Sequence, residues 1–115
     1  MANTFKNAIK SNVTTTGSNY DTLYTAPSSS GNTAIILGLA LANKTTSAVT
    51  VKVQITDTSA SNATIQLLED VSIPANTTLE VLGGQKYVLE AGDILKVQSG
   101  TGTAIDAFLG VMERT

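Results

Sequence analysis

The side chains of this chain that could take part in chemistry are almost all carboxylates. There are nine aspartates and glutamates among 115 residues, with no histidine and no cysteine. The commonest general base, the thiolate nucleophile and the usual nitrogen and sulfur ligands of metals are therefore absent. Catalysis would have to rest on carboxylates alone, so we expect this protein not to be an enzyme.

The carboxylates are also poorly spaced for a shared site. Only Glu69 and Asp70 are adjacent, and in an extended strand neighbouring side chains point to opposite faces, which is wrong for an acid–base pair. Oxygen ligands for calcium could come from Asp57, Glu69, Asp70 and Asp106. No loop has the alternating acidic spacing of a calcium loop, however. We therefore predict no catalytic residue, no metal site and no cofactor.

The composition indicates which elements position these side chains. Threonine, serine and asparagine fill 36 of the 115 positions, which suits strands and turns better than helices. The formal net charge of −2 offers no electrostatic basis for binding nucleic acid or an anionic membrane. The first residues lack the pattern of a secretory signal, and no apolar run has the length of a membrane span. We expect one cytosolically folded domain, with no nucleic acid and no membrane as partner.

Alternating hydrophobic residues predict the strands. The clearest pattern is VTVKVQITD, residues 49–57, in which every second residue is Val or Ile, as in a strand with one face on a core. The stretch TAIILGLALAN, residues 33–43, is apolar on both faces, and Gly38 within it suggests a bulge or a close approach. Similar short patterns recur about every ten residues. They predict an all-β fold, an antiparallel β-sandwich or jelly roll of about eight short strands.

Two stretches read as β-hairpins. YVLEAGDILKV, residues 87–97, has the form strand, turn, strand, with Gly92 available for positive φ and Asp93 able to accept backbone N–H groups. VLGGQK, residues 81–86, is Gly-rich but lacks phosphate-loop spacing, and it reads as a second hairpin turn.

The chain divides into residues 1–18, predicted to form an N-terminal arm, and a single sandwich domain over 19–115. Phe5 and Ile9 are four residues apart and would suit one helical turn, although the segment is too short to hold a helix alone. It would then be either a frayed terminus or a segment that orders against a neighbouring subunit.

Residues 104–114 indicate a covered surface. Alternation sends one set inward, namely Ile105, Ala107, Leu109 and Val111. Phe108 and Met112 then share the opposite face, which is too apolar for open water and implies cover by a second sheet, the arm or another subunit. The candidate contacts to a subunit or coat protein are Phe5, Ile9, Phe108 and Met112.

Tyr20 and Tyr24 form a second candidate site. If the strand around them alternates regularly, the two rings share a face and could stack on a sugar, as in many small β-sandwiches. The alternative is that both rings fill the edge of the core.

A family resemblance spans nearly the whole chain. The segments that carry it are, in order, MANTFKNAI, YTAP, GLALANKT, VTVKVQITD and IPANTTLEVLGGQKYVLEAGDILKVQS. Together with the hydrophobic strand after them, they resemble small virion proteins of tailed bacteriophages, especially marine and cyanobacterial ones. The resemblance implies a non-enzymatic virion component assembled in the host cytoplasm, and it carries over no functional residue.

On this basis we expect a capsid decoration or cement protein, a homo-oligomer with a trimer favoured, which binds the major capsid protein or another virion protein. Removing residues 1–12 would then weaken attachment while leaving the fold intact. A tail, neck or fibre-associated protein of the same fold is an alternative. A module that binds host-surface glycan through Tyr20 and Tyr24 is the alternative of another class.

Overall fold

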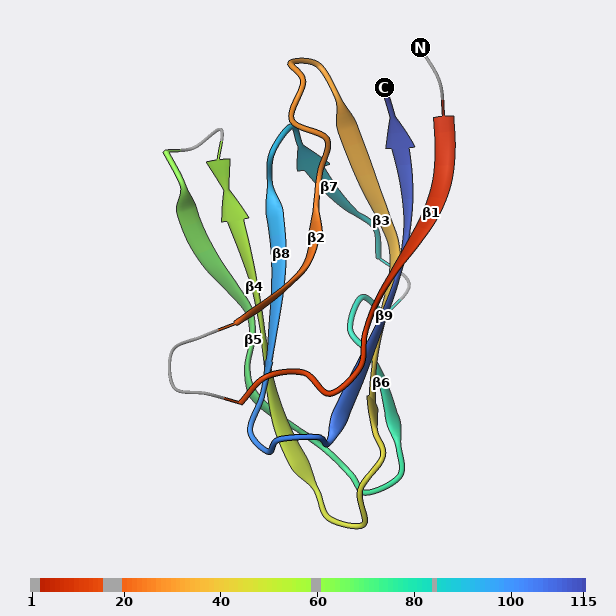
Figure 1. The fold of residues 1–115 in the computed structure, drawn as a ribbon, viewed down its shortest axis with the longest axis vertical. Helices are drawn as coiled ribbons and strands as arrows, with labels where there is room; N and C mark the ends of the chain where they lie inside the picture. Colours follow the sequence, from red (N-terminus) through yellow and green to blue (C-terminus); the bar gives the residue numbers. More distant parts are fainter. Residues whose placement is uncertain (1–2, 16–19, 59–60, 84) are drawn as a thin grey trace.

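The protein folds into two antiparallel sheets packed face to face (Figure 1). The computed structural model describes residues 3–15, 20–58, 61–83 and 85–115. The strands are β1 (Asn3–Lys10), β2 (Asp21–Thr25), β3 (Thr33–Asn43), β4 (Val49–Asp57), β5 (Ala63–Ile73), β6 (Thr78–Glu80), β7 (Tyr87–Glu90), β8 (Ile94–Ser99) and β9 (Ile105–Arg114). Sheet A has the order β1-β9-β3, with β6 and β7 both paired to β3, and sheet B has the order β2-β8-β4-β5.

The pairing is that of a jelly roll. β6 pairs with residues 40–42 of β3 and β7 with residues 33–36, so these two strands lie in line as one interrupted strand. Counted this way, the antiparallel pairs nest inside one another: β4 with β5, β3 with β6 and β7, β2 with β8, and β1 with β9. A long hairpin rolled up in this manner is a jelly roll. The predicted fold class is confirmed.

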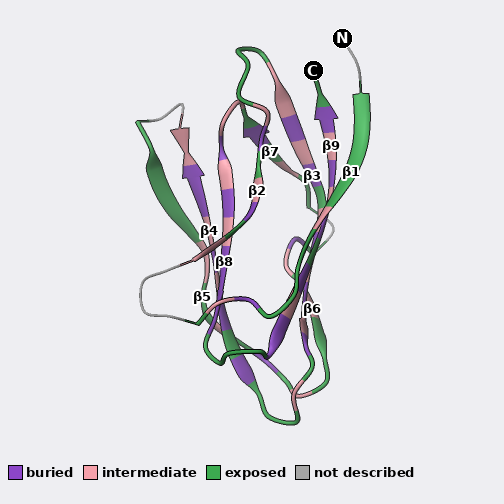
Figure 2. Ribbon diagram, in the orientation of Figure 1, coloured by how far each residue is buried: buried purple, intermediate pink, exposed green. Residues whose placement is uncertain are grey.

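The core lies between the two sheets, where purple strand segments face one another in Figure 2. The alternation expected in β4 is confirmed, because Val49, Val51, Val53 and Ile55 are all buried. That of β9 is confirmed too, with Ile105, Ala107, Leu109 and Val111 buried. β3 also bulges between Ile36 and Gly38, as the glycine suggested, and Leu37 is the extra residue.

The stretch 87–97 is not a hairpin, which corrects the prediction. β7 pairs with β3 in sheet A, whereas β8 pairs with β2 and β4 in sheet B, so the turn between them crosses from one sheet to the other. The local turn chemistry is as expected, since Gly92 has a φ of 83° and Asp93 Oδ2 accepts the Glu90 N–H at 2.9 Å. Turn residues such as Gly92 and Asp93 indicate only that the chain reverses direction. Which sheet each flanking strand joins depends on its pairing with strands that are distant in the sequence.

The Gly-rich stretch 81–86 is not a hairpin turn either. It connects β6 to β7, which both run antiparallel to β3, so these two strands do not form a hairpin with each other. Gly84 lies outside the described residues. Val81 still donates its N–H to the Leu39 carbonyl at 2.9 Å, and Leu82 is buried in the core. Leu82 therefore contributes to the core although it lies between two strands.

Residues 3–10 form a strand, and not the single helical turn considered above. β1 pairs with β9 along its whole length without a register shift. The segment after β1 is also held in place, because Val13 is buried and donates its N–H to the Ile105 carbonyl at 2.9 Å. The role of residues 1–18 as an arm that engages a neighbour stays a prediction.

The region that the structure describes contains no helix of the length and apolar character needed to cross a membrane.

Candidate functional site

The outer face of sheet A carries rows of apolar side chains that run across its strands. In one row Phe5 lies opposite Met112, which lies opposite Ile35, which in turn lies opposite Val88. In a second row Ile9 lies opposite Phe108, and Phe108 lies opposite Ala40. We call this surface, with Leu37 of the bulge, the apolar face.

Several of these side chains are strongly exposed. The exposed fractions are 72% for Phe5, 71% for Ile9, 62% for Val88, 52% for Phe108 and 41% for Leu37. They make up five of the six large hydrophobic residues that are exposed in the described ranges, the sixth being Ile65 on β5. A gathering of exposed apolar side chains on one sheet face usually marks a binding surface.

Between the two rows the face is hollowed, because the strands carry small residues there. Asn7 lies opposite Gly110, and Gly110 lies opposite Gly38. A hollow of about 370 Å³ lies there, lined by Leu37, Gly38, Phe108 and Gly110. A second hollow of about 390 Å³ lies beyond the second row, between Ile9, Phe108 and Thr78. The apolar face therefore offers both protruding rings and shallow sockets to a partner.

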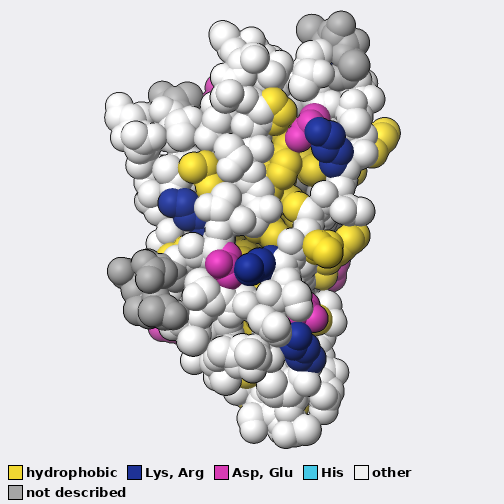
Figure 3. All heavy atoms as spheres, viewed as in Figure 1, with side chains coloured by type: hydrophobic (Ala, Val, Ile, Leu, Met, Phe, Trp, Pro, Cys, Tyr) yellow, Lys and Arg dark blue, Asp and Glu magenta, His cyan; other side chains and the backbone are white. Residues whose placement is uncertain are grey.

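The outer face of sheet B is different in kind. Lys52, Gln54 and Thr50 alternate there with the buried valines of β4. Gln54 donates to Gln66 at 3.0 Å, and Gln66 donates to the Tyr20 hydroxyl at 3.0 Å. The outer face of sheet B is thus polar and internally hydrogen-bonded, while that of sheet A is apolar. The two outer faces therefore suit different surroundings. In the view of Figure 3 hydrophobic side chains appear between the sheets and along the side where β1 lies.

The structure brings the four predicted contact residues together in two pairs across β1 and β9, Phe5 with Met112 and Ile9 with Phe108. Sequence reasoning missed Leu37 and Val88. Period two would have placed Val88 outward, because Leu89 beside it faces the core. Leu37 is exposed only because of the bulge, whose position the sequence hinted at through Gly38. The role of these residues as contacts stays a prediction.

The hydroxyl groups of the two tyrosines of the candidate glycan platform form hydrogen bonds with different sheets. The strand is irregular between Thr22 and Tyr24, and the Tyr24 hydroxyl donates to Glu113 of sheet A. The Tyr20 hydroxyl accepts from Gln66 on β5. Glycan binding through these rings stays a prediction.

Tyr24 belongs to a cluster that joins the two sheets. Its hydroxyl donates to Glu113 Oε2 at 2.5 Å, and Lys6 Nζ lies 2.9 Å from Glu113 Oε1. Glu113 is only 6% exposed, and these hydrogen bonds, that of Tyr24 first, hold its pKa below the usual range. Burial, with the hydrogen bond to Glu113, raises the pKa of Tyr24. The cluster ties β1 and β9 to β2.

Replacing Tyr24 with phenylalanine is expected to lower the free energy of unfolding at pH 7 by about 1.5–3 kcal/mol, the usual value of a hydrogen bond to a charged group. Urea unfolding measures this change. The matched control is Tyr20→Phe, which removes an exposed, uncharged bond and should cost less than about 1 kcal/mol. Equal losses in the two variants would contradict the role given to the cluster.

The same variant tests the acid response. Glu113 in the unfolded chain takes up a proton near its ordinary pKa of about 4.3, while in the folded protein its pKa is lower. As the pH falls below about 5, the unfolded state therefore binds more protons than the folded state. The free energy of unfolding declines until the pH has passed below the pKa of Glu113 in the folded protein. Because Tyr24 is the main cause of the lowered pKa, Tyr24→Phe should lose less stability between pH 5 and pH 3 than the parent protein.

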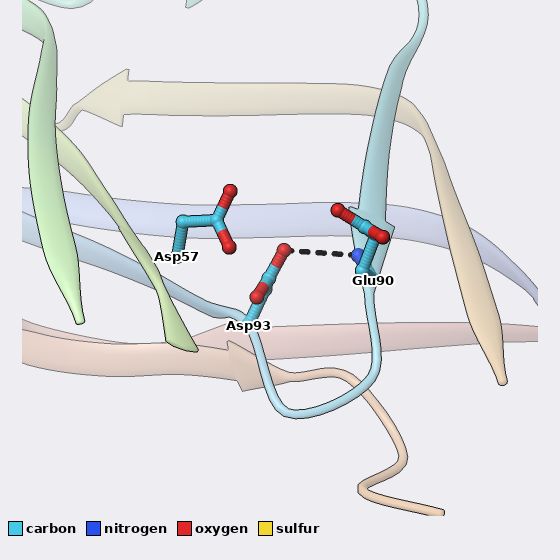
Figure 4. A group of neighbouring side chains, drawn as sticks. All are labelled: Asp57, Glu90 and Asp93. Atoms are coloured by element: carbon cyan, nitrogen blue, oxygen red, sulfur yellow. Dashed lines mark hydrogen bonds between the residues drawn. The ribbon is translucent and has the colours of Figure 1, made fainter. Parts of the chain in front are cut away.

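A group of three carboxylates lies at the turn between β7 and β8. Oxygens of Asp57, Glu90 and Asp93 lie within 4.8 Å of one another (Figure 4), and such oxygens are the ligands that calcium prefers. Asp93 is buried, however, and its two oxygens accept the N–H groups of Thr58 at 3.0 Å and Glu90 at 2.9 Å. These two hydrogen bonds are the turn contacts that the sequence predicted for Asp93.

The other acidic residues considered for calcium, Glu69, Asp70 and Asp106, do not belong to this group and form ion pairs with lysines. Asp70 has a φ of 52° in a bulge of β5. As a result, Glu69 and Asp70 both reach Lys52 Nζ, at 2.9 and 3.7 Å, instead of pointing to opposite faces. Asp106 lies 2.9 Å from Lys44 Nζ, and that hydrogen bond lowers its pKa.

The jelly-roll pairing and the two unlike outer faces define the class of this protein, a jelly-roll β-sandwich. No family model and no curated protein sequence matches the chain. Among solved structures, a chain of the Bacillus endospore appendages, which form disulfide-linked pili, is similar over 98% of this chain and 88% of its own, with a TM-score of 0.52 and 12% identity. The present chain has no cysteine and cannot form such links.

Two structures of infectious bursal disease virus are similar as well. The VP2 subviral particle matches with a TM-score of 0.51 and 13% identity, and the Gx strain structure with a TM-score of 0.54 and 12% identity. Each match covers 96% of this chain but 32% of the viral chain, so the protein spans about a third of the length of those chains. At such low identity the likeness shows the fold alone.

Proposed function

We propose that this protein is a non-enzymatic virion structural protein of a tailed bacteriophage, and that it decorates the capsid by binding the major capsid protein through the apolar face. The observation that carries the proposal is the gathering of five exposed large hydrophobic side chains on one sheet face, opposite a polar sheet. The resemblance to phage virion proteins supports it, as does a fold similar to that of viral particle proteins.

The size of the apolar face fits one contact in a lattice. Four strands about 4.8 Å apart and about 26 Å long present about 500 Å². A standard interface buries about 800 Å² on each partner, so this face alone is smaller than a standard interface. Attachment then grows with assembly, because the completed shell holds many equivalent sites and binding to them stabilises the assembled state by mass action.

The rival within the same class is a protein of the tail, the neck or a fibre. The chemistry of the apolar face fits either location, since both provide neighbouring protein surfaces. What separates them is the number of copies, because the shell repeats its coat protein many times and a tail or neck does not.

The test is a count of this chain relative to the major capsid protein by quantitative mass spectrometry of purified particles. We expect a ratio near one, or one per few coat subunits. A ratio of about a few per cent, at the level of tail components, would move the protein to the tail or neck. Absence from particles would overturn the virion proposal.

A further inference from the structure

The edge strands of the two sheets differ in how well they are protected from pairing with another chain. Exposed edges invite association unless they are short, bulged or interrupted, or carry charged side chains, lysine above all. β2 is short and irregular between Thr22 and Tyr24, β5 has two register shifts, and β6 and β7 have three and four residues. β1 has eight residues in unbroken register and contains no proline. Its only protection is the pair Lys6 and Lys10, and the charge of Lys6 is paired with Glu113 at 2.9 Å.

β1 is therefore the one long, regular edge among the described strands. It lies beside β9 at the margin of the molecule (Figure 1), and in the described part of the chain no strand pairs with its other side. Seven of its eight residues are exposed, Ala8 being the exception. A row of backbone N–H and C=O groups on such a strand is a template for one more strand.

The charges of β1 restrict the register in which a second copy can pair with it. The strand carries two cations, Lys6 and Lys10, and no carboxylate. Two antiparallel copies centred on Lys6 would set Lys6 against itself, and copies centred on Ala8 would set Lys6 against Lys10. Like charges directly opposite each other destabilise a sheet, so these two registers are disfavoured.

A pair centred on Asn7 avoids both conflicts. Asn7 then lies opposite its own copy, Phe5 lies opposite Ile9, and both of these pairs are on the outer face. On the inner side Lys6 meets Ala8, and Lys10 meets Thr4. The strand is thus complementary to a second copy of itself in one register, with an apolar pair on each side of an amide pair.

We propose that two copies of this chain pair antiparallel through β1 about a two-fold axis at Asn7, which joins their A sheets into one continuous sheet. The dimer brings two apolar faces side by side on the same surface, about 1,000 Å² in all, which exceeds the roughly 800 Å² of a standard interface. The inference rests on the edge and the charges of β1, independently of the proposed function. It differs from the trimer that we favoured from the sequence.

Cysteine cross-linking of the full chain tests the pairing, since the chain has no cysteine of its own. Opposite Cα atoms in an antiparallel pair are about 4.5–5.5 Å apart, within the range that a disulfide bridges. Under mild oxidation Asn7→Cys should form a covalent dimer at least tenfold faster than Thr22→Cys, a matched control on the exposed edge strand β2. Intact mass spectrometry and non-reducing electrophoresis measure the rates.

A mixture tests the register. Phe5→Cys and Ile9→Cys chains should cross-link with each other and at least tenfold more slowly with themselves, because the proposed register sets these two positions opposite one another. The unsubstituted protein should sediment with the mass of two chains at high concentration.

Equal rates for Asn7→Cys and Thr22→Cys would overturn the proposal. So would a mass of one chain, or of three, at every concentration. None of these outcomes bears on the particle count, so the two proposals fail separately.

Discussion

The variant Phe108→Glu is expected to bind particles at least about 30-fold more weakly than the parent protein. Phe108 protrudes from the apolar face between the hollows beside Leu37 and Ile9. Aromatic anchors at hot spots typically contribute 2 kcal/mol or more to an interface, and that free energy corresponds to about 30-fold in affinity. A carboxylate at the same place would also lose its water without gaining a partner.

The measurement is the occupancy of particles after a fixed amount of variant is added to shells that lack the protein. The fold should survive, because Phe108 is half exposed and surface substitutions usually change stability by about 0.5 kcal/mol or less. Thr22→Glu, which places the same charge on the exposed edge of sheet B, is the control and should bind normally. Normal occupancy of Phe108→Glu would exclude the apolar face as the site of attachment.

Point variants are sharper here than the removal of residues 1–12. That deletion would take away β1, leave the edge of β9 unpaired and remove Lys6 from the nearly buried Glu113. A loss of attachment would then have two explanations, a missing contact and a weakened fold. Phe5→Ser and Ile9→Ser change the exposed side chains of β1 and leave its backbone pairing in place.

The variant Asn43→Ala is expected to lower the free energy of unfolding by about 2–4 kcal/mol, since it leaves several buried polar groups without partners. Asn43 is 2% exposed at the end of β3. Its amide nitrogen donates to the carbonyls of Ser47 at 2.9 Å and Ile73 at 3.0 Å, while its oxygen accepts the Thr45 N–H at 2.9 Å. One side chain therefore ties the turn after β3 to the end of β5.

Urea unfolding with and without this substitution measures the loss. Asn3→Ala, on the exposed strand β1, is the matched control and should change stability by less than about 0.5 kcal/mol. A loss below 1 kcal/mol for Asn43→Ala would mean that water replaces the amide, and that the link between the turn and β5 contributes little.

The sequence was a good guide wherever burial follows a local period. Alternation in β4 and β9 assigned their inner residues correctly, and with them the outward positions of Phe108 and Met112. The fold class was predictable as well, because many short strands and few helix-forming stretches leave little besides a sandwich or jelly roll.

Pairing between distant strands was beyond the reach of local pattern. Residues 87–97 contain a turn with the expected Gly92 and Asp93. The two strands nevertheless belong to different sheets, because β7 pairs with β3 and β8 pairs with β4. The contact of Tyr24 with Glu113 spans 89 positions of sequence and left no local signal. The apolar face could be predicted only in part for the same reason. Its residues Phe5 and Ile9 lie beside Met112 and Phe108 only because β1 pairs with β9 in this register.

The nested pairing has a consequence for biosynthesis. β1 pairs with β9, so about 95 residues must be translated after Lys10 before its partner strand begins at Ile105. At about 5–20 residues per second this takes about 5–20 s. Throughout that time β1, with its exposed Phe5 and Ile9, is on the nascent chain without its native neighbour. Folding dominated by such distant pairs is slow, and closure of the roll is a late event that follows synthesis of β9.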